Sequence, residues 1–221
     1  MLVRERMTRR PITIPEDTSI DKALHLMRQE KVRRLPVVDR HAKLVGIVAE
    51  KDLLYASPSP ATTLSIYEIA SLLSKIAVRE LMTRDVITVA EDTPLEEAAR
   101  IMADNAIGAL PVVRGDELVG IITETDLFKI FLEIFGARTE GVRVNILVPE
   151  GKGVLSKLTT RIAEAGGNIL ALGTLLAEDP GHREITIRVS DISQEALISA
   201  LETVNLELEI LDIRFCELPV C

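Results

Sequence analysis

One stretch of the sequence occurs twice, about 75 residues apart. The motifs that return in the same order are Met-Thr, Glu-Asp-Thr, Leu-Pro-Val-Val, Leu-Val-Gly-Ile and Asp-Leu, starting at residues 7, 16, 35, 44 and 52 and again at 82, 91, 110, 118 and 126. The spacing falls from 75 to 74 residues between the third and fourth motifs, where the second copy has the shorter turn. A length change confined to a turn is expected of two copies of one folded unit. Two such units side by side form a pseudo-symmetric pair with clefts between them.

Each copy is predicted to fold as β-α-β-β-α. Helices are indicated by apolar residues at i, i+3, i+4 and i+7: Ile20, Ala23, Leu24 and Met27 in the first copy, and Leu95, Ala98, Ala99 and Met102 in the second. Pro94 is expected just inside the second helix. The predicted strands are 12–14, 35–38 and 44–48, with counterparts at 86–89, 110–113 and 118–122, and the closing helices start near Lys51 and Thr125.

The remaining segments follow other patterns. Between the copies, a Ser-Pro-Ser-Pro cluster at 57–60 breaks the chain, and apolar residues at helical spacing predict a packed helix over 64–76. After residue 138 the predicted order is strand 142–148, helix 154–165, strands 169–177 and 184–189, helix 194–204 and strand 208–215. That β-α-β-β-α-β order is the ferredoxin-like unit, so the fold class is α/β (α+β).

Composition excludes several classes of function. The net charge of −8, the absence of Trp and an aromatic content of 3% argue against nucleic-acid binding. No apolar run approaches the roughly 18 residues of a membrane helix, and the first ten residues do not resemble a secretory signal. The two cysteines, Cys216 and Cys221, form no metal-ligand pattern with the histidines, so a reducing cytoplasmic setting is expected. No motif for nucleophilic, acid–base or metal catalysis is present, and we expect no enzyme activity.

The repeated Met-Thr and Leu-Pro-Val-Val motifs, with Gly120-Ile121-Ile122-Thr123-Glu124-Thr125-Asp126, resemble a CBS repeat, and two repeats form a CBS pair (Bateman module). The Gly153-opened helix, Gly167-Asn168-Ile169 and the order of elements resemble an ACT domain. The expected boundaries are 1–57 for the first CBS repeat, 58–76 for the linker helix, 77–135 for the second repeat and 141–217 for the ACT-like domain. This arrangement is similar to that of bacterial acetoin-utilisation accessory proteins.

The CBS resemblance implies a site for an adenine nucleotide: AMP, ADP or ATP as a regulatory ligand, without a covalent cofactor and with the participation of Mg²⁺ left open. A carboxylate at the start of a helix can accept hydrogen bonds from both ribose hydroxyls, and free N–H groups there favour phosphate. Thr123 and Asp126 take these roles, with Val86 and Ile87 against the base and Ala109 and Pro111 on the other side. The first-repeat counterparts are Asp52, Ile12, Arg34 and Pro36.

Two features of these positions leave alternatives open. Thr123-x-x-Asp126 is also the sequence of a helix capping box. In the first repeat Ala49 replaces the threonine, so we expect the second site to bind and the first to be weaker or differently selective. Arg33 and Arg34 align with Gly108 and Ala109; they either neutralise a chain of two or more phosphates or pair with surface acids.

The ACT resemblance implies an amino-acid site at subunit interfaces, here Lys152, Gly153, Val154 and Asn168. A tight turn at Gly153 and dimerisation through edge strands are the alternatives. The sequence therefore predicts a regulatory sensor: a homodimer by resemblance, whose CBS pair binds an adenine nucleotide and whose ACT domain relays the signal in acetoin or related carbon metabolism. The alternative is a non-catalytic interaction scaffold with degenerate sites.

Overall fold

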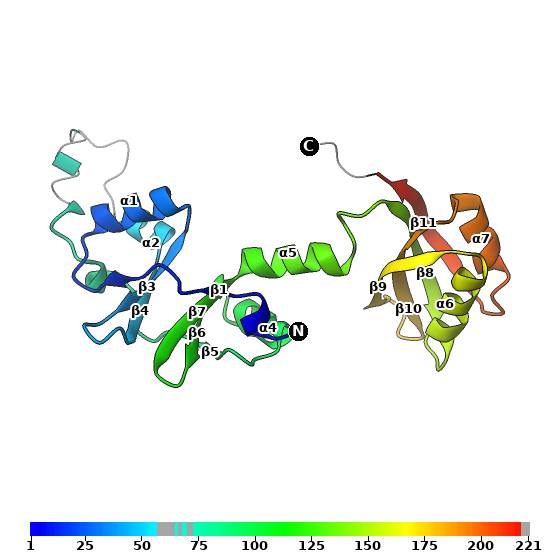
Figure 1. The fold of residues 1–221 in the computed structure, drawn as a ribbon, viewed down its shortest axis with the longest axis horizontal. Coiled ribbons are helices and arrows are strands. Elements are labelled where there is room, and N and C mark those ends of the chain that lie inside the picture. Colours follow the sequence, from blue (N-terminus) through cyan, green and yellow to red (C-terminus); the bar gives the residue numbers. More distant parts are fainter. Residues whose placement is uncertain (57–64, 66–67, 70–72, 218–221) are drawn as a thin grey trace. The chain divides into compact units, whose positions relative to one another are not determined.

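A computed structural model describes residues 1–56, 65, 68–69 and 73–217. The chain divides into two compact units, Met1–Leu127 and Phe128–Cys221, whose elements are labelled in Figure 1. Six of the thirteen residues of the predicted linker helix over 64–76 lie outside the described residues. Of its described part, Leu73 is buried, and Ile69 and Ile76 pack against the core of the first repeat.

The first repeat has the predicted β-α-β-β-α order. Its elements are β2 (Ile14–Pro15), α1 (Ile20–Glu30), β3 (Arg34–Val38), β4 (Leu44–Ala49) and α2 (Glu50–Tyr55). Strand β3 is central, parallel to β2 and antiparallel to β4. The four predicted apolar positions of α1 are all buried, and they form one core with side chains of β3, β4 and α2.

The second repeat is built in the same way. Its elements are β5 (Val89–Ala90), α4 (Leu95–Asp104), β6 (Ala109–Arg114), β7 (Glu117–Thr123) and α5 (Glu124–Ile134). Pro94 was predicted inside α4 but lies just before it, at the N-cap, with a ψ of 143°. An extended ψ at this residue keeps it outside the helix.

The N-terminal arm of the first repeat (residues 1–9) joins the sheet of the second repeat. Strand β1 (Thr8–Arg9) is antiparallel to β7, with Thr8 opposite Ile121, and the sheet order is β1-β7-β6-β5. In the same way, the arm of the second repeat (residues 77–84) contacts the sheet of the first repeat, through a single antiparallel bridge between Thr83 and Ile47 of β4. Each arm begins with a 3₁₀ turn, η1 (Val3–Glu5) or η2 (Val78–Glu80). The strands predicted at 12–14 and 86–89 are shorter than expected. Of the residues in these two ranges, only Ile14 and Val89 pair with the sheet of their own repeat.

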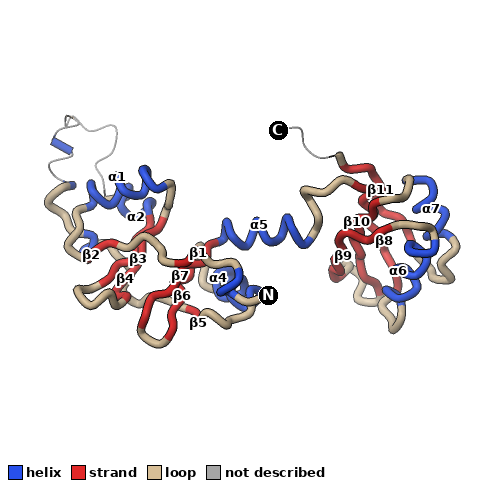
Figure 2. Tube along the Cα trace, in the orientation of Figure 1, coloured by secondary structure: helices blue, strands red, loops and turns tan. Residues whose placement is uncertain are grey.

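The second unit has the predicted ferredoxin-like topology. Its elements are β8 (Gly141–Pro149), α6 (Val154–Glu164), β9 (Asn168–Leu176), β10 (His182–Ser190), α7 (Gln194–Glu202) and β11 (Glu209–Cys216). The antiparallel sheet has the order β11-β8-β10-β9, and α6 and α7 cover one face of it (Figure 2). Gly166, with a φ of 85°, follows α6 and allows the turn into β9.

The opposite face of this sheet carries a row of arginines. Arg143 of β8 lies opposite Arg188 of β10 and Arg214 of β11. Asp212 separates two of them, with its Oδ2 atom 2.8 Å from Arg143 Nη1 and 3.0 Å from Arg214 Nε. Arg188 is buried, and its Nη1 donates to the carbonyl of Thr139. No helix among the described residues is long and apolar enough to cross a membrane.

Candidate ligand-binding cavities

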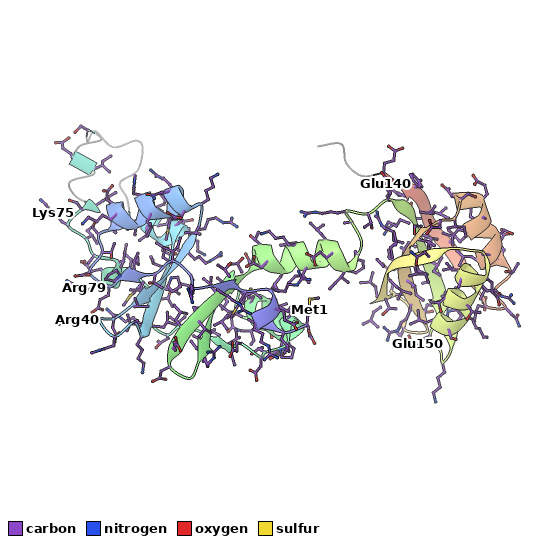
Figure 3. The ribbon with its side chains drawn as sticks, viewed as in Figure 1. Met1, Arg40, Lys75, Arg79, Glu140 and Glu150 are labelled. Atoms are coloured by element: carbon purple, nitrogen blue, oxygen red, sulfur yellow. The ribbon has the colours of Figure 1, made fainter. Side chains whose placement is uncertain are left out.

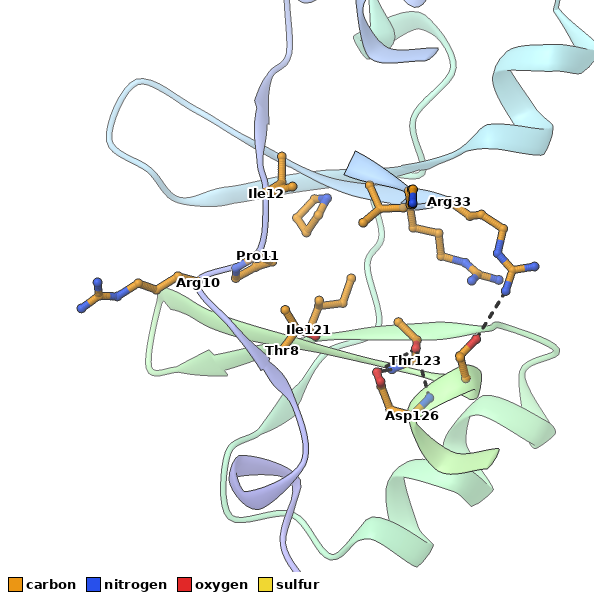
Figure 4. Close-up of a pocket in the computed structure, with 13 residues that line it drawn as sticks. Thr8, Arg10, Pro11, Ile12, Arg33, Ile121, Thr123 and Asp126 are labelled. Atoms are coloured by element: carbon orange, nitrogen blue, oxygen red, sulfur yellow. Dashed lines mark hydrogen bonds between the residues drawn. The ribbon is translucent and has the colours of Figure 1, made fainter. Parts of the chain in front are cut away.

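Two cavities lie within the first unit and involve both repeats. The Asp126 cavity has a volume of about 390 Å³, and the Asp52 cavity has a volume of about 600 Å³. Both volumes fall in the range of roughly 300–1,000 Å³ that is usual for small-molecule sites. Figure 4 shows the Asp126 cavity between the strands of the first repeat and the start of α5 in the second.

The exchange of N-terminal arms explains why each cavity mixes the two repeats. Five predicted nucleotide-binding residues line the Asp126 cavity: Thr123, Asp126, Ile12, Arg34 and Pro36. Five also line the Asp52 cavity: Val86, Ile87, Ala109, Asp52 and again Arg34. Our grouping of Val86, Ile87 and Ala109 with Asp126 is therefore wrong, because the segment after each arm faces the helix start of the other repeat. Pro111 is in the centre of β6 and lines neither cavity.

Asp126 lines its cavity and also caps α5. Its Oδ2 atom accepts hydrogen bonds from the backbone nitrogen of Thr123 at 3.0 Å and from Thr123 Oγ1 at 2.7 Å. The backbone nitrogen of Asp126 is 3.4 Å from Thr123 Oγ1. This reciprocal pattern is a capping box. The structural alternative and the candidate site thus involve the same two side chains.

Asp52 holds the matching position at the start of α2 without a cap. Ala49 is the N-cap residue, and its side chain makes no capping hydrogen bond. The Asp52 side chain makes no hydrogen bond or ion pair with the residues that the structure describes, and it is half-buried in the cavity wall. The carboxylate of the site that was expected to be weaker is therefore the one that is not engaged in capping.

The charged side chains that line the two cavities differ in sign. Four basic residues and one acid line the Asp126 cavity: Arg10, Lys31, Arg33, Arg34 and Asp126. Arg33 Nη2 lies 3.4 Å from Thr125 Oγ1 across this cavity, whereas the guanidinium of Arg10 points outward (Figure 4). Two basic residues and three acids line the Asp52 cavity: Arg34, Lys51, Asp52, Asp85 and Glu124.

Arg34 lines both cavities. Its Nη2 atom is 3.9 Å from Glu124 Oε2, at the long end of ion-pair distances. Gly108 makes room for this pair, since a Cβ at residue 108 would collide with Arg34 Nη2 and approach Glu124 Oε2 to 2.5 Å. The sequence alignment of Arg33-Arg34 with Gly108-Ala109 pointed to an asymmetric charge. It did not reveal that the glycine accommodates the arginine of the other repeat.

A third cavity, of about 420 Å³, lies in the second unit at the loop before α6. Of the four residues predicted there, Gly153 and Val154 line it, whereas Lys152 and Asn168 do not. Gly153 has a φ of 82°, the left-handed turn that was the alternative interpretation. Asn168 starts β9 and is exposed, and Arg183 pairs with Glu150 at the cavity wall. No cluster of three or more metal-ligating side chains occurs in the described part of the chain.

The chain belongs to the CBS-domain family, whose model matches residues 3–59 and 78–133. It is 31% identical to a CBS domain-containing protein of Dictyostelium discoideum over 61% of this chain and 93% of that protein. A structure named as an acetoin utilization protein (AcuB) from Vibrio cholerae is 38% identical, with a TM-score of 0.52 over 62% of this chain and 93% of that one. The CBS domain pair of protein MJ0100, solved with 5′-methylthioadenosine and S-adenosyl-L-methionine, is 31% identical, with a TM-score of 0.51 over 63% and 98%.

Proposed function

We propose that this protein is a regulatory sensor whose CBS pair binds an adenosine-containing ligand. The main support is a repeated arrangement: a carboxylate in the first turn of a helix, at the wall of a cavity that both repeats form. Asp126 holds this position in one cavity and Asp52 in the other. A carboxylate accepts two hydrogen bonds from adjacent hydroxyls, which is what a ribose offers.

Apolar side chains supply the surface for a base in the Asp52 cavity. Val86 and Ile87 come from the segment after the arm of the second repeat, Ile107 from the loop after α4, and Ala109 from the start of β6. In the Asp126 cavity Ile12, Pro36 and Ile121 have this role. A flat purine against such residues loses water on both sides, and roughly 25 cal/mol per Å² of apolar area then favours binding.

The Asp126 cavity suits a ligand with two or more phosphates. Lys31, Arg33 and Arg34 place positive charge beside the first turn of α5, and the dipole of that helix also favours an anion at its N-terminal end. Guanidinium groups bind phosphate oxygens in pairs. We therefore rank ADP and ATP above AMP for this cavity, with Thr123 near the sugar or first phosphate.

The similarity to MJ0100 supports an adenosyl ligand, because that CBS pair was solved with two of them. The similarity to AcuB supports a role in acetoin or related carbon metabolism. We further propose that residues 141–217 form an ACT domain, on the ferredoxin-like topology of the second unit. It would bind an amino acid at the loop before α6 or relay the signal through a homodimer in the cytoplasm.

A thermal-shift panel on the full chain tests this proposal, since a ligand that binds the native state raises stability by RT ln(1 + [L]/Kd). The panel contains AMP, ADP, ATP, NAD, S-adenosylmethionine, 5′-methylthioadenosine, cyclic dinucleotides and single amino acids. We expect ADP and ATP to raise the melting temperature and Asp126→Ala to remove most of that shift. Asp21→Ala is the matched control, because Asp21 is in the first turn of α1 and lines neither cavity.

No shift with any adenosine-containing compound would favour the second candidate, a non-catalytic scaffold. The specific observation in its favour is that Asp126 already caps α5. Turnover of a panel member, followed by chromatography, would contradict the non-catalytic reading. A shift that Asp52→Ala removes and Asp126→Ala retains would assign the binding of that compound to the Asp52 cavity.

A further inference from the structure

We propose that Arg34 couples the two cavities, so that an anionic ligand in the Asp126 cavity strengthens the binding of a cationic adenosyl ligand in the Asp52 cavity. This inference rests on the proposed function and extends it from one ligand to two of opposite charge. It assigns a regulatory role to a single side chain that lines both sites.

The first argument is that one repeat supplies a cation which the other lacks. Arg34 starts β3, and its counterpart Ala109 starts β6. The counterpart of Glu124 is Glu50, and both backbone nitrogens bond the equivalent carbonyls, Gly108 at 3.1 Å and Arg33 at 2.9 Å. The backbone is thus symmetric, but Arg34 reaches across to the glutamate of the other repeat, whereas Ala109 has no charged side chain to do so.

The second argument is that the cavities differ in charge even though they are related by the repeat. Acids outnumber bases around the Asp52 cavity, and bases outnumber acids around the Asp126 cavity. A phosphate chain is therefore favoured in the Asp126 cavity. An adenosyl ligand with a positive group, such as a sulfonium, is favoured beside Asp85 and Glu124. Each cavity would be selective by charge while sharing the recognition of ribose.

The third argument concerns the ease with which Arg34 can move. Its separation of 3.9 Å from Glu124 is long, and the Glu124 side chain is 54% exposed. Such a pair contributes little stability, so a phosphate in the Asp126 cavity can draw the guanidinium away. Glu124 then loses its ion-pair partner Arg34, and the Asp52 cavity becomes more negative. By linkage the two ligands must strengthen each other's binding by the same factor.

Isothermal titration calorimetry on the full chain measures this coupling, with ATP as the anion and S-adenosylmethionine as the cation. We expect saturating ATP to lower the Kd of S-adenosylmethionine about 5-fold, at the low end of typical coupling. The Kd of 5′-methylthioadenosine, which lacks the positive charge, should change less than about 2-fold, since Coulombic attraction is absent. Arg34→Met should bind S-adenosylmethionine more tightly without ATP and show no further change with it.

Two other variants separate coupling from simple loss of charge. Arg33→Met should weaken ATP binding but retain the coupling once ATP is saturating. Glu124→Gln should weaken S-adenosylmethionine and abolish the coupling. The exposed Arg40, in the turn between β3 and β4 (Figure 3), gives the control Arg40→Met, which should behave like the wild type.

Several outcomes would overturn the proposal. Coupling that persists in Arg34→Met excludes Arg34 as its cause, and competition between ATP and S-adenosylmethionine excludes separate charge-selective sites. If both ligands bind independently, the proposed function stands and the coupling fails. If neither ligand nor 5′-methylthioadenosine binds, the proposed function fails and the coupling fails with it.

Discussion

The Sδ atom of Met82 lies against the α-carbon of Gly46, so that a Cβ added at Gly46 would be only 2.5 Å from the sulfur. The same relationship joins Met7 and Gly120 in the other half of the pair. Each methionine comes from the arm of one repeat, and each glycine comes from the last strand of the other, β4 or β7. The Met-Thr and Leu-Val-Gly-Ile motifs of the sequence are thus two sides of one contact.

A valine at either glycine is expected to disrupt this contact. The added carbons would meet the methionine and also the carbonyl oxygen of Thr83 or Thr8, each 3.1 Å from the Cβ position. Overpacking of this kind costs about 1–3 kcal/mol, so Gly46→Val and Gly120→Val should each lower the free energy of unfolding in urea by that amount. Gly151→Ala is the control, because its Cβ would have 3.7 Å to the nearest side chain. Equal stability of all three variants would show that the arms are not held at these glycines.

A threonine hydroxyl is expected to stabilise either helix start, so removing it from one and adding it to the other should change stability in opposite directions. Thr123→Ala removes the cap of α5 and should cost about 1 kcal/mol. Ala49→Thr should add a similar stability by installing a capping box with Asp52. Urea unfolding measures both changes, and Ala49→Val controls for the shape of the side chain. If Ala49→Thr and Ala49→Val are equally stable, no box has formed with Asp52.

Gly108→Ala offers a second way to move Arg34. The added methyl group would collide with Arg34 Nη2 and lie 2.5 Å from Glu124 Oε2. Because both atoms are at the ends of flexible side chains, the guanidinium and the carboxylate should turn away from each other at little cost in stability. We expect unfolding to change by less than about 0.5 kcal/mol and S-adenosylmethionine to bind more tightly, as in Arg34→Met. Unchanged calorimetric affinity would mean that the position of Arg34 beside Glu124 does not affect the Asp52 cavity.

Asp212 makes the stability of the second unit depend on pH. Hydrogen bonding to Arg214, followed by the charges of Arg214 and Arg143, holds the pKa of Asp212 below its ordinary value of 3.8. A lowered carboxyl pKa contributes stability that is complete above the ordinary value and is lost as pH falls through the lowered one. Asp212→Asn should therefore be less stable than the wild type at neutral pH, and the difference should shrink below about pH 4.

Methyl NMR resonances of the second unit, followed during urea unfolding at several pH values, measure this difference. Asp191→Asn is the matched control, because this substitution removes the same charge. The Asp191 carboxylate accepts a hydrogen bond from the uncharged Ser190 at 2.8 Å. A difference between Asp212→Asn and the wild type that does not depend on pH would exclude the ion pairs as its source.

Local patterns predicted most of the fold. The apolar spacing from Ile20 to Met27 and from Leu95 to Met102 identified α1 and α4, because a helix buries one face regardless of what the rest of the chain does. The extent of the short strands could not be predicted in this way. Thr8 and Thr83 pair with the other repeat, and a period of two residues does not reveal which sheet a strand joins.

The candidate site was predicted only in part for the same reason. The repeat identified Asp52 and Asp126 as equivalent positions, and both line cavities. Many of the partners of each aspartate come from the other repeat, and their grouping depends on the crossing of the arms. The position of Arg34 depends on the small size of Gly108, a relationship between repeats that no local motif contains.

The crossed arms also bear on how such a chain could have arisen by duplication. In this arrangement the arm of a single copy pairs with the sheet of another copy, so a polypeptide with one copy would need a second molecule to pair with its own sheet. Gene duplication would then have converted this intermolecular pairing of arm and sheet into an intramolecular one. Cutting the chain at residue 77 and mixing the halves should accordingly yield reassembly rather than two independent mini-domains.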